Sequence, residues 1–139
     1  MEEGTKIDMN VFHLGTAVVK FNLPIELVDS INKAYDEKFK ELKPHNDYLA
    51  GKIAEEKAVD EILTDEMNNI FSFCFQQYLN ILQKTKWNPT LASAWINEMK
   101  SGEYNPVHYH SGVNSELGLS SVLMLKRPDW YGVEASRTE

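Results

Sequence analysis

Two histidines separated by one residue, His108 and His110, have the types and the spacing that suit metal chemistry. A neutral imidazole is a common ligand of iron, zinc, copper, nickel and manganese, so the pair narrows the metal little. On an extended backbone, side chains two residues apart point to the same face of a strand, and both rings could then reach one ion. The intervening Tyr109 would face the other way, as packing. A pair at this spacing that binds no metal remains the commoner case, so the neighbouring sequence has to decide.

Turn residues and apolar stretches flank this pair. Gly102 and the Asn105-Pro106 dipeptide are typical of turns, and residues 119–125, LSSVLML, predict the next strand. Residues 90–99 alternate well enough for a strand that places Trp95, Asn97 and Met99 on one face. A third metal ligand would be needed, and the acidic side chains near the pair in sequence are Glu116, Asp129 and Glu134.

The composition indicates one ordinary globular domain with an acidic surface. The chain has 139 residues, of which 42% are hydrophobic and 25% are charged, and its formal net charge is −7. An acidic chain without a basic run argues against nucleic acid or an anionic membrane surface as the partner. A small anionic ligand held by one local cation stays compatible with this charge.

Cysteine usage and the absence of hydrophobic signals predict a cytoplasmic setting. Cys74 is the only cysteine, so neither an intrachain disulfide nor a cysteine-rich zinc module can form, and its apolar surroundings favour a buried, inert thiol. The first residues lack the pattern of a signal peptide, and no run approaches the roughly twenty apolar residues of a membrane span. We therefore expect a reducing compartment and no membrane partner.

Two amphipathic helices are expected to position the histidine region. After Pro24, residues 25–42 carry apolar side chains at three- and four-residue spacings, namely Leu27, Ile31, Ala34, Tyr35 and Phe39. A second helix begins near Thr64, a suitable N-cap. Its wide apolar stripe consists of Met67, Ile70, Phe71, Cys74, Tyr78, Ile81 and Leu82, and Phe73, Phe75 and Leu79 widen it further. So much apolar surface must be covered, most simply by a sheet.

The other segments of the N-terminal half have weaker sequence patterns than the two helices. Residues 7–23 are rich in β-branched and aromatic types, which predicts one or two strands with a bend or bulge at Gly15. Residues 43–51 read as a loop in which His45 faces solvent, although such a loop position could border a site. Residues 52–63 contain few apolar residues at helical spacing, so a helix and a non-helical structure are equally compatible with this segment. His13 is a lone histidine between apolar residues, which is more often structural than a ligand.

The order of motifs from Trp95 onward resembles the first half of the catalytic core of a family of iron(II)/2-oxoglutarate-dependent oxygenases. Its members are similar in the order W-x-N, a glycine turn, H-x-H, and a strand of the form L-S-G-V-x-Y-L. The matching residues are Trp95-Ile96-Asn97, Gly102, Tyr104 to His110, Leu119 to Leu125, and Pro128. The resemblance covers roughly residues 87–128. Ser121 stands where the family usually has glycine, and Leu123 to Leu125 replaces its aromatic-rich strand end.

The resemblance implies a site for Fe(II) and 2-oxoglutarate. In such sites two histidines and usually one carboxylate hold the iron, which leaves open positions for the small-molecule co-substrate and for oxygen. His108 matches the first histidine of the motif, and His110 occupies a position where the wider superfamily has aspartate. Asn97 and Tyr104 are expected as neighbours that hydrogen-bond the co-substrate. The implied activity is hydroxylation of an unidentified substrate, coupled to decarboxylation of 2-oxoglutarate to succinate.

The expected fold is α+β, with N-terminal helices packed on an incomplete double-stranded β-helix, a jelly-roll-like sheet. Residues 1–139 would form one domain, in which residues 1–86 are a strand and a helical lead-in and residues 87–139 are the first half of the β-helix core. The family's later histidine and basic residue have no counterpart after His110. We therefore expect a fragment, a shortened member completed by another chain, or a degenerate binding protein. A homo-oligomer would cover the exposed strand edges.

Two other readings of the sequence stay open. In a cupin, which shares the β-helix architecture, the metal motif begins with a glycine separated from a histidine by five residues, as Gly102 is from His108. The cupin glutamate should follow the second histidine after three or four residues, whereas Glu116 follows His110 after five, and Leu123 stands at the place of the later cupin glycine. The other reading is a non-catalytic structural or assembly protein that keeps a remnant of the fold.

Overall fold

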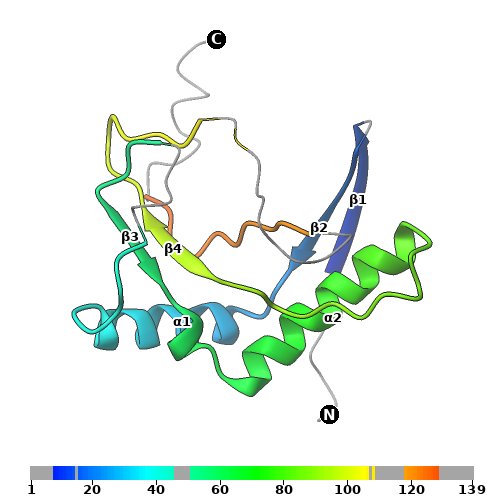
Figure 1. The fold of residues 1–139 in the computed structure, drawn as a ribbon, viewed down its shortest axis with the longest axis horizontal. Helices are drawn as coiled ribbons and strands as arrows, with labels where there is room; N and C mark the ends of the chain where they lie inside the picture. The colour runs from blue at the N-terminus through cyan, green and yellow to red at the C-terminus, as the bar shows by residue number, and fades with distance from the viewer. Residues whose placement is uncertain (1–7, 15, 46–50, 107, 109–117, 129–139) are drawn as a thin grey trace.

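The computed structural model describes residues 8–14, 16–45, 51–106, 108 and 118–128. Within these residues the chain forms an α+β fold with two α-helices and two small antiparallel sheets of two strands each. In chain order the elements are β1 (Asp8–Leu14), β2 (Thr16–Asn22), α1 (Ile25–Lys38), β3 (Glu55–Ala58), the 3-10 helix η2 (Asp60–Ile62), α2 (Asp65–Ile81) and β4 (Trp95–Glu98). Figure 1 shows both helices along one side of the fold, with the β1–β2 hairpin and the β3–β4 pair rising from them.

The N-terminal residues form a hairpin, as their β-branched composition predicts. β1 and β2 pair antiparallel over their full lengths, from Asp8 opposite Asn22 to Leu14 opposite Thr16. Gly15, where a bend was expected, lies outside the described residues. The hairpin is tied to α2 because the Tyr78 hydroxyl donates a hydrogen bond to the Ala17 carbonyl oxygen at 2.7 Å.

Both predicted helices are confirmed. α1 starts after Pro24 and buries Leu27, Ile31 and Tyr35, which is the stripe that the four-residue spacing predicts. It ends at Lys38, one turn earlier than the pattern suggested. In α2 the Thr64 side chain accepts a hydrogen bond from the Met67 N–H, the N-cap arrangement in which a threonine oxygen satisfies an otherwise unpaired helix donor.

The buried face of α2 differs in detail from the predicted stripe. Its buried residues are Met67, Cys74 and Leu79, and Leu79 is among the most deeply buried side chains, 2% exposed. Phe73, which would widen an apolar stripe, is 49% exposed. Burial raises the pKa of the Cys74 thiol, so it resists ionisation and agrees with the expected inert core residue. Within the described residues, no helix has the length and apolar character to cross a membrane.

The structure resolves residues 52–63 as a strand and a short 3-10 helix. β3 pairs antiparallel with β4, and the register runs from Glu55 opposite Glu98 to Ala58 opposite Trp95. The thin apolar pattern of this segment could not predict a strand, because the strand is set by pairing with residues some forty positions later. After β3 the chain buries Val59 and, in η2, Ile62, in one cluster with Tyr35 of α1.

The core consists of two apolar clusters between the helices and the strands. One contains the buried Tyr35, Leu42, Val59 and Ile62, and the other contains the buried Leu27, Ile31 and Met67. Ile96 of β4 packs against both clusters. A single strand residue therefore joins the two parts of the core, and it fixes which face of β4 looks toward the helices.

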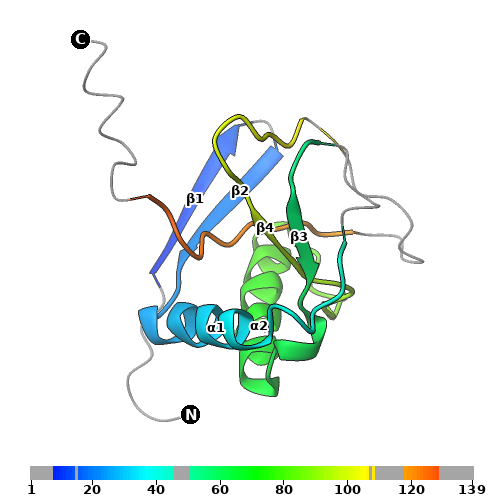
Figure 2. The ribbon, with the colours of Figure 1, turned by 90° about the vertical axis from the view of Figure 1, so that its left-hand side faces the viewer.

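The expected strand at residues 119–125 is present only as an extended segment without a ladder among the described residues. Both views of the ribbon show this segment, in orange, crossing the fold on the strand side of the helices (Figures 1 and 2). Leu123 and Leu125 pack against the second core cluster. The Asn32 amide donates to the Leu125 carbonyl oxygen at 3.2 Å, and the Lys126 ammonium lies 3.0 Å from the Asp36 carboxylate. Side-chain docking on α1 thus holds the segment in place.

The turn after β4 is closed by hydrogen bonds, and it brings Tyr104 beside residue 52. The Glu103 N–H donates to the Lys100 carbonyl oxygen at 3.0 Å, and Lys52 and Tyr104 exchange two backbone hydrogen bonds of 2.9 and 3.1 Å. The predicted turn at residues 100–103 is confirmed. Gly51 sits so close to this strand that a Cβ there would collide with the Tyr104 carbonyl oxygen and lie 2.9 Å from the Asn105 Cα.

We predict that Gly51→Ala destabilises the fold more than Gly102→Ala does. At Gly51 the added methyl group meets backbone atoms, and overpacking of this kind costs about 3 kcal/mol at the upper end of its usual range. At Gly102 the φ of +81° is strained for any side chain, but a Cβ meets nothing within 4 Å, so the cost is about 1 kcal/mol. Urea unfolding of both variants tests this, and equal losses would contradict the close approach of the two segments.

Candidate functional site

The two faces of β4 have different surroundings. Ile96 faces the helices, because it packs against both core clusters. Side chains alternate along a strand, so Trp95 and Asn97 lie on the opposite, helix-distal face of β4. This agrees with the predicted shared face of Trp95 and Asn97. The helix-distal face is therefore where the sequence motif would present its functional groups.

Glu56 of β3 joins Asn97 on this face. The two residues are directly opposite in the β3–β4 register. The Glu56 carbonyl oxygen accepts a hydrogen bond from the His45 N–H at 2.9 Å, so the Glu56 backbone polar groups point away from β4. Glu56 and Asn97 are thus a pair without mutual backbone hydrogen bonds, and in such pairs the side chains approach more closely, with Cα atoms about 4.5 Å apart.

Glu56 is buried, and Asn97 is half-buried with its amide oxygen covered. Glu56 is 2% exposed, and the Asn97 Oδ1 atom is buried without a hydrogen-bond partner among the described residues. Burial raises the pKa of the Glu56 carboxyl, and the charge of His45 acts in the opposite direction. A buried acceptor without a donor typically costs about 1–3 kcal/mol. The Asn97 Oδ1 acceptor is therefore a costly feature of this face, and a hydrogen-bond donor, such as a protonated Glu56 or a group of a ligand, would relieve it.

His45 also belongs to this face, which corrects the expectation that it faces solvent. Its ring stacks on Trp95, with 5.1 Å between centroids and 19° between ring planes. Residues 43–45 run beside β3, where Pro44 forms an isolated bridge with Lys57. The loop-like composition of residues 43–51 contains no signal for this contact, because the stacking depends on β3 lying between His45 and β4.

Tyr104 and His108 follow the turn, and both are exposed. The Tyr104 side chain is 57% exposed, and its backbone pairs with Lys52, which fixes the position of this stretch relative to β3. The Glu103 carboxylate reinforces the turn by accepting the Lys100 N–H at 2.8 Å and the Ala54 N–H at 3.0 Å. The hydrogen bond from Lys100 is the main reason why the pKa of Glu103 is lowered.

The His108 ring is held by a contact with a nearby backbone carbonyl. Its Nδ1 atom lies 2.8 Å from the Pro106 carbonyl oxygen. A carbonyl oxygen only accepts, so this contact needs the proton on Nδ1, and the lone pair of the neutral ring then lies on Nε2. Backbone carbonyls commonly hold metal-binding imidazoles in this way. His108 itself is not in a strand of the structure, although a strand was expected there.

The rest of the predicted metal site is not described by the structure. His110 and the acidic residues considered as a third ligand, Glu116, Asp129 and Glu134, lie outside the described residues. Within the part of the chain that is described, no group of three or more His, Cys, Asp or Glu side chains is arranged to hold a metal ion. The structure therefore places Asn97 and Trp95 together with Glu56 and His45, and places His108 separately after the turn.

The extended segment after the histidine region alternates as a strand face would. Leu123 and Leu125 pack inward, whereas Val122 is 87% exposed and Met124 is 62% exposed. Leu123, like Ile96, packs against the second core cluster. Val122 and Met124 therefore form the outward side of this segment, which exposes apolar side chains to solvent.

Comparison with protein-family models, with curated proteins and with solved structures finds no match for this chain. The functional argument therefore rests on the residues themselves and on their arrangement.

We predict that Leu123→Ala lowers the free energy of unfolding by about 2 kcal/mol, the lower end of the cost for a leucine truncated in a core. Val122→Ala, one residue away, should change it by less than about 0.5 kcal/mol, because surface substitutions rarely do more. Urea unfolding of the two variants measures the difference. The reverse order would mean that the segment docks with its other face.

We predict opposite pH dependences for Glu56→Gln and Glu103→Gln. The raised pKa of Glu56 means that the native state binds its proton more tightly than the unfolded state does, so the wild type loses stability as the pH rises from about 4 through the raised pKa. Glutamine cannot ionise, so Glu56→Gln should gain stability relative to the wild type across that range.

The second substitution is a matched control for the first. The pKa of Glu103 is lowered, so its contribution is present above the ordinary glutamate pKa and is lost as the pH falls through the lowered value. Glu103→Gln should therefore be less stable than the wild type near neutral pH, and the difference should shrink in acid. Urea unfolding at a series of pH values measures both effects. If the two variants showed the same sign of slope, the burial of Glu56 would be contradicted.

Proposed function

We propose that the chain is an iron(II)/2-oxoglutarate-dependent oxygenase-like protein that presents the first half of such a site. The observation that carries the proposal is the division of β4 between its faces, with Ile96 in the core and Asn97 on the helix-distal face. In the W-x-N motif the asparagine can reach a co-substrate only if it lies on the face of the strand that is not packed against the core. The alternation of residues 122–125 supports a further β-helix strand on the same layer.

The described residues provide some of the groups that the proposed metal and co-substrate would need. His108 has the ring orientation for metal binding through Nε2, and His110 would be the second ligand. Asn97 would hydrogen-bond the co-substrate through the N–H groups of its amide, because the carboxylates of 2-oxoglutarate only accept hydrogen bonds. Exposed Tyr104 would contribute a hydroxyl. Bound iron and 2-oxoglutarate would supply the oxidising chemistry, and the residues named here would bind and orient them.

The finer fold and setting belong to the same proposal. The helices and strands would be the lead-in and first strands of a double-stranded β-helix, whose remaining strands come from elsewhere. A second copy of the chain is one source, which would make the protein a homo-oligomer. The buried, unpaired Cys74 suits a reducing, cytoplasmic compartment.

One observation favours a second candidate function, a non-catalytic assembly protein. Val122 and Met124 expose apolar side chains from an extended segment that has no ladder partner among the described residues. Extended backbone of this kind is a template for pairing with another chain. A protein that only assembles would use this segment and would need no metal.

We predict stoichiometric binding of Fe(II) or Mn(II) that His108→Ala and His110→Ala each abolish, because a site with two protein imidazoles loses its chelate when one is removed. Calorimetry under anaerobic conditions measures the affinity. His13→Ala is the matched control, since His13 lies on β1 in the N-terminal hairpin and should leave binding unchanged. Well-folded wild-type protein without metal affinity would refute the metal site.

Two further measurements separate the alternatives. Turnover of 2-oxoglutarate to succinate with iron present supports the oxygenase, whereas metal binding without affinity for 2-oxoglutarate supports the cupin-like reading. A stable oligomer that binds no metal, found by measuring the mass in solution, supports the assembly protein. Val122→Lys, which places a charge on the exposed face, should then dissociate that oligomer.

A further inference from the structure

A row of three polar side chains crosses the helix-distal face of the strands. Pro44 and Lys57 form an antiparallel bridge, and the next pair in this register is His45 and Glu56. The β3–β4 register places Asn97 on the other side of Glu56. Residues directly opposite each other in antiparallel strands project to the same face. Glu56 is therefore the middle of the row, with an imidazole on one side and an amide on the other.

The middle side chain is the most deeply covered of the three. Glu56 is 2% exposed, whereas His45 and Asn97 are half-buried. Burial is the main reason why the pKa of the Glu56 carboxyl is raised, and the charge of His45 acts against it. A carboxyl group with so little exposure needs a protein partner in whichever form it takes, because water cannot serve as one.

The two neighbours of Glu56 favour opposite protonation states. A charged imidazole donates N–H to a carboxylate, whereas an amide oxygen only accepts and so needs a protonated carboxyl. The His45 ring reaches the next row of the face, where it stacks on Trp95 opposite Ala58. Since burial outweighs the charge of His45 in its effect on the pKa of Glu56, the protonated form and its bond to the amide oxygen are favoured.

Other charged residues in neighbouring positions on the described strands and turn are Lys43, Glu55, Lys57 and Glu103. Alternation directs both neighbours of Glu56 within β3 to the helix side. The Lys43 ammonium lies 3.3 Å from the Glu61 carboxylate. Glu103 accepts hydrogen bonds from two backbone N–H groups at the turn. The described residues that face the Glu56 carboxyl are therefore His45 and Asn97.

We propose that Glu56 is a positioning residue for Asn97: its protonated carboxyl donates a hydrogen bond to the Asn97 Oδ1 atom and thereby fixes the direction of the amide. This bond satisfies the Asn97 atom that is buried without a partner among the described residues. The NH₂ group of the amide then points away from Glu56, where it can donate to the carboxylate of a co-substrate. The hydrogen bond itself is independent of the iron site, and only this consequence for the co-substrate rests on the proposed function.

Loss of the proton reverses the direction of the amide. A carboxylate only accepts, so ionised Glu56 repels the Asn97 Oδ1 atom and attracts the NH₂ group. The amide then turns about its last side-chain torsion and presents its oxygen to the co-substrate carboxylate, which also only accepts. Affinity for 2-oxoglutarate should therefore be highest below the raised pKa of Glu56 and should fall as the pH rises through it.

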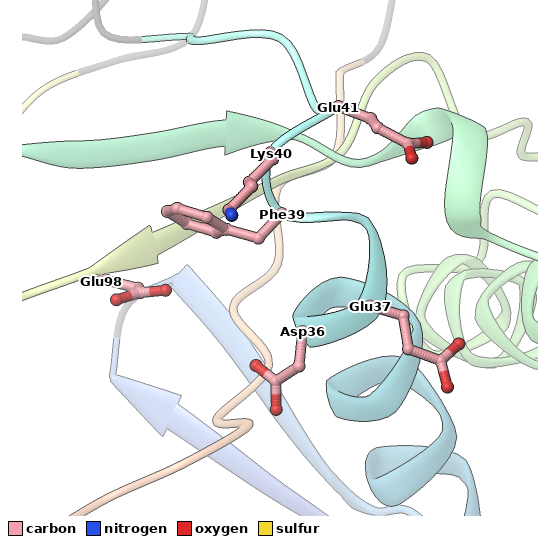
Figure 3. A pocket seen from close by; sticks show the side chains of 6 residues that line it. All are labelled: Asp36, Glu37, Phe39, Lys40, Glu41 and Glu98. Carbon is pink, nitrogen blue, oxygen red and sulfur yellow. The ribbon is translucent and has the colours of Figure 1, made fainter.

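The helix side of the same strand pair provides a matched control. Glu55 is adjacent to Glu56 in the chain but lies opposite Glu98. Glu98 borders a hollow together with Asp36 of α1 (Figure 3), so this pair of glutamates lies on the face away from Asn97. Glu55→Gln therefore removes the same charge as Glu56→Gln without changing the row of polar side chains.

The experiment is a pH titration of the full chain, labelled with ¹³C and ¹⁵N, in which NMR follows the Glu56 carboxyl carbon and the Asn97 NH₂ group. We expect both signals to change with one midpoint above the ordinary glutamate pKa of about 4.3. Glu56→Gln keeps a donor beside Oδ1, so the Asn97 signal should stay at its wild-type low-pH position. Glu55→Gln should leave both signals titrating together. An Asn97 signal that does not titrate with Glu56, or that follows the His45 ring instead, overturns the inference.

The wild-type titration needs no substitution, so it decides the question even if Glu56→Gln does not fold. Calorimetry of 2-oxoglutarate binding to the Mn(II)-loaded chain then tests the consequence for the proposed site. The Kd of the wild type should rise roughly threefold or more relative to that of Glu56→Gln as the pH passes through the shared midpoint. Other titrations affect both proteins equally, so this ratio isolates Glu56. Glu56→Met, which has no donor, should bind roughly twofold or more weaker than Glu56→Gln below the midpoint.

The outcomes separate this inference from the proposed function. A Kd that depends on pH equally in the wild type and in Glu56→Gln overturns the role of Glu56 in binding. If the two NMR signals share a midpoint but 2-oxoglutarate does not bind at any pH, the hydrogen bond between Glu56 and Asn97 is confirmed and the proposed function is refuted.

Discussion

The four-residue ladder between β3 and β4 is the interaction on which the rest of the structure depends. It sets Ile96 into both core clusters, and through the alternation of side chains it decides what every other residue of the pair faces. A slip of one residue would exchange the two faces of a strand. Asn97 would then enter the core and Ile96 would leave it, so the burial of Ile96 against α1 and α2 also specifies the register of the polar residues.

The helices could be predicted from the sequence because their signals are local. The spacing of Leu27, Ile31 and Tyr35 and the capping oxygen of Thr64 lie within a few residues of the backbone that they stabilise. The strand β3 could not be predicted, since residues 55–58, EEKA, contain no apolar alternation and the strand exists through its pairing with β4. For the same reason the sequence predicted a strand at residues 119–125, whereas these residues have no ladder partner among the described residues.

The sequence could predict only the part of the candidate site whose residues lie on a single strand. The face shared by Trp95 and Asn97 follows from their spacing on β4. Glu56 and His45 could not be assigned to that face, because they reach it through β3 and the segment beside it. The sequence EEKAVDEIL does contain one signal for Glu56. Glu55 and Glu56 are consecutive, so in a strand their side chains must point to opposite faces. That signal becomes usable once the strand is known.

Because Glu55 and Glu56 are adjacent, the β3–β4 pair has an unfavourable arrangement of polar groups on each of its two faces. Glu55 is opposite Glu98 on the helix side, whereas Glu56 is opposite Asn97 on the other side, where it is 2% exposed. Water and mobile ions screen the first pair, because its charges are accessible. They screen the buried Glu56 carboxylate much less, so a proton is its simplest relief. Since the backbone of one ladder separates the two pairs, a ligand on one face can act on the other only by shifting the strands.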